Sequence, residues 1–135
     1  MITAIDTNVL IDILGADPQF GPRSLAAARR CRHEGILIAC DAVWAEVLAA
    51  FPDPTQTEAA LQRLPVEYSS IGKAGATRAG VAWRAYRQHG GPRERLVTDF
   101  LVGAHAMEEA DRLLTRDRGF QRAAFAGLTI VDPTR

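Results

Sequence analysis

Lysine is nearly absent from this 135-residue sequence, and the chain has no net formal charge. Arginine supplies every basic residue except Lys73. A net charge of zero argues against a protein that holds nucleic acid by bulk electrostatics alone. The planar fork of arginine suits local phosphate contacts, whereas genome composition and a solvated surface explain the same arginines equally well.

Cysteine and long apolar runs are also scarce. Cys31 and Cys40 are too few for a disulfide framework and lack metal-ligand spacing, so we expect buried free thiols. No apolar run approaches the roughly 20 residues that a membrane-spanning helix needs. The first residues include Asp6 and Asp12 and no basic leader. This pattern predicts a first strand and helix rather than a signal peptide, and therefore a cytoplasmic protein.

Several common site motifs are missing as well. The Gly72-Lys73 region fits neither G-x-x-x-x-G-K-[ST] nor G-x-G-x-x-G, and no glycine cradle follows the first strand, which argues against a phosphate loop or a dinucleotide site. The three histidines have no metal spacing, and His105 lies in an apolar helix, where we expect a hydrogen-bonded core histidine. Ser69 and Ser70 have no paired base that the sequence reveals.

Short apolar runs alternate with helical patterns along the chain. Hydrophobic residues make up 47% of it, which is enough for one domain spanning residues 1–135. The alternation predicts an α/β fold, with a parallel sheet and helices on both of its faces. The expected strands are Ile2–Ile5, Ile36–Ala39, Val66–Tyr68, Arg112–Thr115 and Leu128–Val131. The expected helices are Asp6–Leu14, Pro22–Arg32, Ala42–Phe51, Thr55–Leu64, Lys73–His89 and Asp99–Glu109, with a small helix after the turn Arg116–Phe120.

Four acidic residues lie where such a fold would gather them: Asp6, Glu46, Asp99 and Asp117. Each follows an expected strand or falls in the first turns of an expected helix. These places share one edge of a parallel sheet, where ligands bind at the point at which the strand order reverses. Neighbouring carboxylates oppose each other's ionisation unless a cation neutralises them. The pattern therefore predicts a divalent-metal site and phosphodiester hydrolysis.

Each of these acids also has an ordinary structural interpretation. Asp6 could cap the first helix, and Asp117 could be a plain turn residue. Asp99 begins an apolar helix for which Thr98 is the expected cap, which favours a site role for Asp99. Glu46 could be solvated, but its small neighbours indicate a crowded or concave setting. Their joint placement is a stronger argument than any single position.

Four sequence blocks resemble the PIN domain, and more closely the VapC toxins of bacterial toxin–antitoxin pairs. The blocks are Ile5–Leu10, Trp44–Val47, Thr98–Ala106 and Leu113–Phe120, and the resemblance covers essentially the whole chain. It implies a three-layer sandwich around a parallel sheet of about five strands in the order 3-2-1-4-5.

The resemblance further implies an endoribonuclease toxin that depends on Mg²⁺ or Mn²⁺, forms a homodimer and is neutralised by a VapB-type antitoxin. It implies no membrane partner. It assigns catalysis to the four acids and hydrogen-bonding support to Thr7, Asn8 and Thr115. We expect the metal at Asp6, Asp99 and Asp117, because Mg²⁺ takes few carboxylates directly. Candidate contacts to RNA phosphates are Arg93, Arg95, Arg116 and Arg118.

Two other functions stay open at this point. A non-catalytic scaffold of the same fold could use the acidic pocket to bind an arginine of a partner. A phosphohydrolase acting on small molecules could use an acidic pocket on a similar sheet, and the fold alone does not separate these functions.

Overall fold

The computed structural model describes residues 1–90, 97–121 and 125–135. Its helices are α1 (Thr7–Leu14), α2 (Gly21–Glu34), α3 (Asp41–Ala50), α4 (Pro54–Arg63), α5 (Gly72–Gln88) and α6 (Val97–Glu109), with a 3-10 helix η1 (Arg118–Gln121). Its strands are β1 (Ile2–Ile5), β2 (Ile36–Cys40), β3 (Glu67–Ser69), β4 (Arg112–Leu114) and β5 (Ile130–Val131). Arg93 and Arg95 lie outside the described residues.

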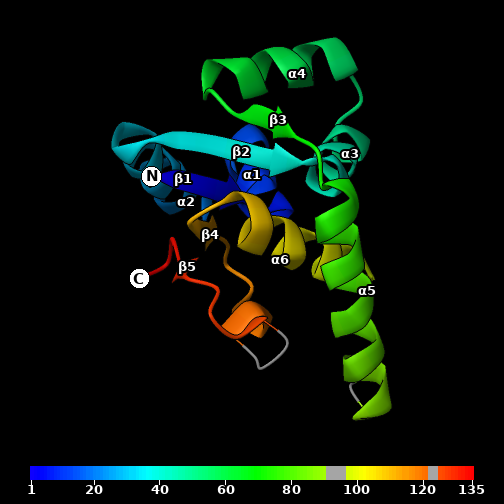
Figure 1. Cartoon of the computed structure of the whole chain (residues 1–135). Coiled ribbons are helices and arrows are strands. Elements are labelled where there is room, and N and C mark those ends of the chain that lie inside the picture. The colour runs from blue at the N-terminus through cyan, green and yellow to red at the C-terminus, as the bar shows by residue number, and fades with distance from the viewer. Residues whose placement is uncertain (91–96, 122–124) are drawn as a thin grey trace.

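The five strands form one parallel sheet in the order β3-β2-β1-β4-β5, which confirms the predicted order (Figure 1). In the register of the sheet, Ala4 of β1 lies opposite Ile38 of β2 and Leu113 of β4. All three residues are buried. Strands covered on both faces are expected to read as continuous apolar runs, as the sequence of β2 does.

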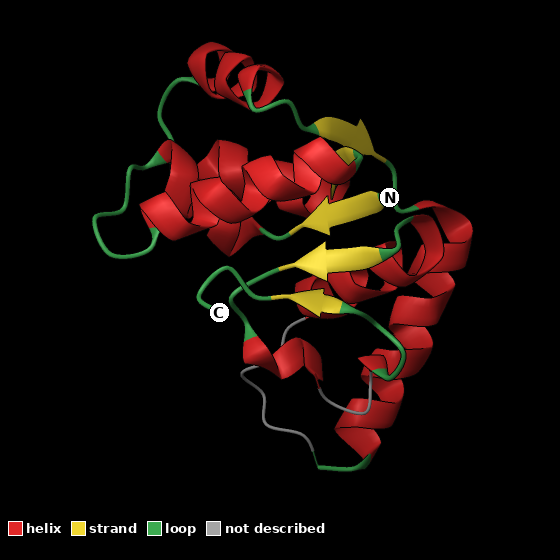
Figure 2. Cartoon of the chain, turned by 90° about the vertical axis from the view of Figure 1, so that its left-hand side faces the viewer, coloured by secondary structure: helices red, strands yellow, loops and turns green. Residues whose placement is uncertain are grey.

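Helices cover both faces of the sheet (Figures 1 and 2). On one face α2 packs against β1 and β2, with α1 beside it. On the other face α6 packs against β1 and β4, and α5 packs along α6. The near-continuous apolar sequence of α6 fits this place, because it is held between the sheet and α5. Both termini lie at the side of the molecule opposite α5 (Figure 1).

Several local predictions are confirmed and others need correction. Cys31 and Cys40 are buried free thiols, as expected. Thr98 is not the cap of α6, because the helix already begins at Val97 and Thr98 lies in its first turn. The second helix begins at Gly21 with Pro22 in its first turn, which agrees with the predicted start at Pro22, because proline suits the first turn of a helix. Within the described residues, no helix is long and apolar enough to cross a membrane.

The fold generates a prediction at Gly35, between α2 and β2. A Cβ added there would overlap the carbonyl oxygen of Met1, which accepts a hydrogen bond from the amide of Ile36 at 3.0 Å. We expect Gly35→Ala to lower the free energy of unfolding by about 1–3 kcal/mol, measured by urea denaturation.

Gly80→Ala is the matched control, because a Cβ at this position of α5 meets no atom within 4 Å. Alanine forms helix better than glycine, so this variant should gain up to about 1 kcal/mol. An equal decrease in the free energy of unfolding in both variants would contradict the proposed overlap at Gly35.

Candidate active site

Asp6 lies at the junction between the central strand β1 and helix α1. Its amide donates to the carbonyl of Leu114 at 3.0 Å, which ties it to the end of β4. The residue is 7% exposed, and its carboxylate accepts a hydrogen bond from the amide of Thr7 at 2.7 Å. Asp6 is therefore the N-cap of α1 and also a buried acid at the carboxyl edge of the sheet, so the two interpretations of this residue are compatible.

The three predicted supporting residues are gathered around Asp6. The hydroxyl of Thr115 donates to its Oδ2 at 2.7 Å, and Nδ2 of Asn8 donates to the same oxygen at 3.2 Å. Thr115 Oγ1 in turn accepts the amide of Asp117 at 2.9 Å. One network thus joins the start of α1 to the segment that follows β4, although these segments are more than 100 residues apart in sequence.

The electrostatics of Asp6 reflect the gathering of acids at this edge. Burial is the largest cause that raises the pKa of Asp6, from 3.8 to about 6. Hydrogen bonds from Thr115 and Thr7 act in the opposite direction, and the charges of Asp117 and Asp99 raise the pKa further. The charges of two further predicted acids therefore act on Asp6, which places three of the four predicted acids in one region of the molecule.

Asp99 and Asp117 are half-buried. Asp99 lies in the first turn of α6. Asp117 follows β4 and accepts the amide of Gly119 at 2.8 Å, so its interpretation as a turn residue is correct as well. Its place beside Thr115 also puts it close enough to raise the pKa of Asp6.

Glu46 of α3 joins the site through Thr7. The hydroxyl of Thr7 donates to Oε1 of Glu46 at 2.8 Å. Glu46 is exposed, and so are its neighbours Ala45, Ala49 and Ala50. Of the two predicted settings, crowded or concave, the crowded one is therefore wrong, and the concave one stays a prediction. An exposed, anchored carboxylate next to a buried acid can orient a water molecule or a polar ligand.

The donor set suits a hard divalent cation, because every candidate ligand is a carboxylate oxygen. In the part of the chain that the structure describes, however, no three His, Cys, Asp or Glu residues form a ready-made metal cage. Mg²⁺ does not require one, since it binds through one or two carboxylates, substrate phosphates and water. The raised pKa of Asp6 shows that its negative charge is under-compensated, which is what a cation would relieve.

Two side-chain contacts were not predicted from the sequence. Arg116, a candidate phosphate contact, pairs with the carboxylate of Asp12 at 2.7 Å, whereas Arg118 is exposed in η1. Ser69 has a partner after all, because Nε2 of His105 lies 2.9 Å from its hydroxyl. His105 is 1% exposed, as expected for a core histidine, and burial lowers its pKa. No local sequence signal links these pairs.

The raised pKa of Asp6 predicts how stability depends on pH. An unfolded aspartate has a pKa of about 3.9, so between about pH 4 and pH 6 the folded state holds the extra proton. The contribution of Asp6 to stability is therefore fully present below about pH 4 and is lost as the pH rises through about 6.

Asp6→Asn removes this titration. The stability of the variant relative to the wild type should therefore rise by up to about 3 kcal/mol between about pH 4 and about pH 7. Urea denaturation in the presence of EDTA measures this difference without interference from cations. A difference that stays constant between the two pH values would contradict the burial of an ionisable Asp6.

Solved structures share this fold at low sequence identity. VapBC-1 from nontypeable Haemophilus influenzae aligns over 100% of both chains with 21% identity and a TM-score of 0.72. VapBC2 from Rickettsia felis aligns over 98% of both chains with 19% identity and a TM-score of 0.72. FitAcB from Neisseria gonorrhoeae aligns over 100% of this chain and 99% of its own, with 20% identity and a TM-score of 0.65. No curated protein sequence matches this chain.

The family assignment comes from the sequence itself. The model of the PIN domain matches residues 3–126, which include β4, all of β1 except Ile2, and all four acids of the site. The strand order, the helices on both faces and the acids at the carboxyl edge agree with that match. The chain belongs to the PIN-domain family.

Proposed function

We propose that this protein is a metal-dependent endoribonuclease, the toxin of a cytoplasmic toxin–antitoxin pair. The observation that carries the proposal is the buried carboxylate of Asp6, whose pKa is raised by burial and by the charges of Asp117 and Asp99. The structural neighbours support the toxin assignment, because they include VapBC proteins and a toxin–antitoxin complex from Klebsiella pneumoniae.

The proposed cofactor is Mg²⁺, with Mn²⁺ as an alternative. Asp6 and Asp99 would hold the cation directly, and Asp117 would lie at the margin of its coordination sphere. A bound cation supplies Lewis-acid stabilisation of a phosphoryl oxygen and makes an attacking water more acidic. Thr115 and Asn8 hold the Asp6 carboxylate in one orientation through hydrogen bonds of 2.7 and 3.2 Å.

The remaining groups would act on the water and on the substrate. Glu46, fixed by the hydroxyl of Thr7 at 2.8 Å, would orient the attacking water and receive its proton. In-line attack on the phosphorus would then break the bond to the 3′-oxygen and leave a 5′-phosphate and a 3′-hydroxyl. Arg118, exposed beside Asp117, is the proposed phosphate contact among the described residues. Contacts of this kind position RNA without reading its sequence.

Removing a single acid tests this assignment. Asp6→Asn and Asp99→Asn should each reduce RNA cleavage by at least about 100-fold, because each removes a proposed metal ligand while the fold is retained. Glu67→Gln on the exposed edge strand β3 makes the same chemical change away from the site and should cleave normally. EDTA should abolish cleavage, and added Mg²⁺ should restore it.

The alternatives give different results in the same assay. Full cleavage by a folded Asp6→Asn protein, or cleavage that resists EDTA, would contradict the proposal. Hydrolysis of a chromogenic phosphomonoester without RNA cleavage would instead identify a small-molecule phosphohydrolase. A wild type that binds no Mg²⁺ in calorimetry and cleaves nothing would identify a binding scaffold.

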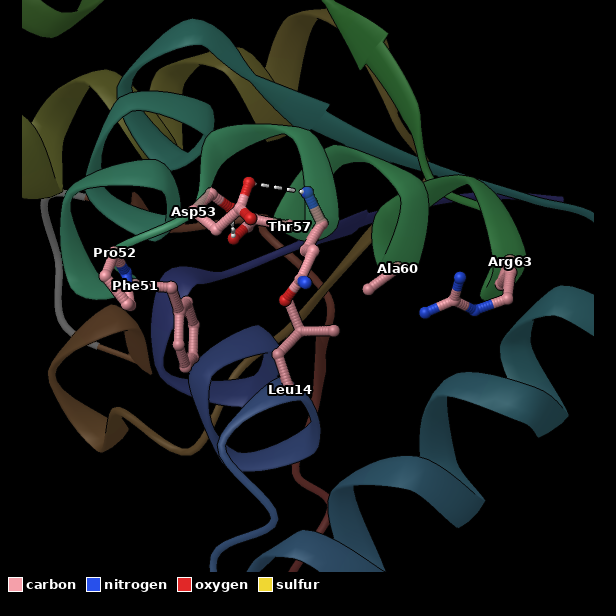
Figure 3. A pocket seen from close by; sticks show the side chains of 8 residues that line it. Leu14, Phe51, Pro52, Asp53, Thr57, Ala60 and Arg63 are labelled. Carbon is pink, nitrogen blue, oxygen red and sulfur yellow. Dashed lines mark hydrogen bonds between the residues drawn. The ribbon is translucent and has the colours of Figure 1, made fainter.

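The proposed antitoxin needs a surface, and a groove beside α4 offers one. Leu14 and Phe51 lie on one side of a hollow of about 260 Å³, and Thr57, Ala60 and Arg63 of α4 lie along another (Figure 3). Leu14, Ala60 and Arg63 also line a second hollow, which continues toward α2. Both hollows are smaller than most small-molecule sites, so they suit the side chains of a peptide.

The charges around this groove indicate what kind of peptide would bind. Arg63 lines both hollows. Arg29 of α2 lines the second hollow and, with Arg32 and His33, a third one next to it. The carboxylate of Asp53 already accepts the amide of Gln56 at 3.1 Å, as the cap of α4. We therefore propose that an amphipathic antitoxin segment with an apolar face and acidic flanks lies here. The expected homodimer stays a separate prediction.

A bulky anion placed in the groove should block that segment. Ala60→Glu should reduce the affinity for the partner antitoxin by at least about tenfold, since its side chain fills the hollow and its charge repels the acidic flanks. Calorimetric titration of the purified partner measures this loss. Ala85→Glu, on an exposed position of α5, is the control and should bind with unchanged affinity. Equal affinities for the two variants would place the antitoxin elsewhere.

A further inference from the structure

A partly buried ion pair lies next to the carboxylate cluster and has no place in the proposed chemistry. Asp12 of α1 accepts two hydrogen bonds from the guanidinium of Arg116, from Nε at 2.7 Å and from Nη2 at 3.0 Å. The hydroxyl of Ser24 in α2 donates a third, at 2.8 Å. The Asp12 side chain is only 5% exposed. The guanidinium of Arg116 also lies over the ring of Phe20, 4.0 Å from its centroid.

This arrangement fixes the arginine more tightly than a surface ion pair would. A bidentate contact between a guanidinium and a carboxylate defines the orientation of both groups, and stacking on a ring restricts the guanidinium plane further. Burial of a carboxylate is unfavourable unless its oxygens are satisfied, and here three donors satisfy those of Asp12. The hydrogen bond to Asp12 is also the main cause that raises the pKa of Arg116.

The fixed arginine lies between two residues of the site. Thr115, before it, donates to Asp6, and Asp117, after it, is one of the clustered acids. The amide of Arg116 itself donates to Oδ1 of Asn8 at 3.2 Å. The chain segment 115–117 is therefore held to α1 at two places: near the start of the helix by Asp6 and Asn8, and near its end by Asp12.

Two attachments to α1 fix the orientation of segment 115–117, whereas a single attachment would let it rotate. Asp6 caps α1 and Asp12 lies in its second half, about 9 Å further along the helix axis at 1.5 Å per residue. The amide of Thr115 also donates to the carbonyl of Val131 in β5 at 3.0 Å, so Thr115 itself is held by the sheet. Without the attachment at Asp12, residues 116–117 could pivot about Thr115, and the carboxylate of Asp117 would move with them.

We propose that Asp12 is a positioning residue of the carboxylate cluster: by holding the side chain of Arg116, it sets segment 115–117 in the geometry that binds the divalent cation. This rests on the proposed function only in that the cluster binds a cation. It also gives Arg116 a role in place of a contact to RNA phosphate.

Metal affinity tests the proposal with Mn²⁺ as the probe. Asp12→Asn should weaken Mn²⁺ binding by about 10-fold or more in calorimetry, because outer residues that orient metal ligands have effects of that size. Glu108→Gln is the matched control. It breaks the Arg78–Glu108 pair, also 2.7 Å long, which joins α5 to α6 away from the site. It should bind Mn²⁺ within about twofold of the wild type.

Ser24→Ala is a milder second variant, in case Asp12→Asn fails to fold. It removes one of the three donors to Asp12 and leaves the charges in place. It should weaken Mn²⁺ binding in the same direction but by less. If folded Asp12→Asn or, in its absence, Ser24→Ala binds Mn²⁺ as tightly as Glu108→Gln does, the proposal is overturned.

Amide hydrogen exchange gives a readout that does not need the metal. The amide of Asp117 donates to Thr115 and that of Gly119 to Asp117, so both report on the segment. In metal-free Asp12→Asn they should exchange at least about tenfold faster than in Glu108→Gln, while amides of β1 stay unchanged. Unchanged exchange at Asp117 would overturn the positioning role. A wild type that binds no Mn²⁺ would instead contradict the proposed function, and exchange would still decide the role of Asp12.

Discussion

The hydrogen bond from the hydroxyl of Thr115 to the buried carboxylate of Asp6 joins the two halves of the site. Asp6 ends the central strand and caps α1, whereas Thr115 directly follows β4, so this contact aligns two neighbouring strand ends at 2.7 Å. The remaining features of the site build on it. Asn8 binds the same carboxylate oxygen, Asp117 binds Thr115, and Arg116 binds Asn8. The site thus depends on pairing between β1 and β4.

Hydrogen bonds at this junction also partly offset the unfavourable burial of the Asp6 carboxylate. A buried carboxylate loses hydration, and here two further acids add to the unfavourable field. Hydrogen bonds from Thr115 and Thr7 offset part of that effect, but the pKa of Asp6 still lies at about 6. Near neutral pH the residue is therefore ionised at the expense of stability. A bound divalent cation would stabilise the ionised carboxylate and with it the folded state, which links the stability of the protein to its proposed activity.

Much of this arrangement could be predicted from the sequence, and the successes share one cause. The continuous apolar strands, the alternation with helices and the parallel topology place all strand exits at one edge, so Asp6, Asp99 and Asp117 could be grouped without coordinates. The predictions that failed concern side-chain partners. The exposure of Glu46 and the pairing of Ser69 with His105 depend on tertiary packing that no local pattern encodes. The contact between Asp12 and Arg116 could not be predicted for the same reason. Asp12 has no distinguishing position on a helical wheel, and its partner lies 104 residues away.

The central claim is that the carboxylates of this edge form a cation site, and anomalous diffraction tests it most directly. Crystals grown with Mn²⁺, measured above the manganese absorption edge, should show an anomalous peak in contact with Asp6 and Asp99, next to Asp117. The same crystals of Asp6→Asn should show a much weaker peak there or none. A well-ordered wild-type site without manganese, or manganese bound only at other carboxylates, would contradict the account.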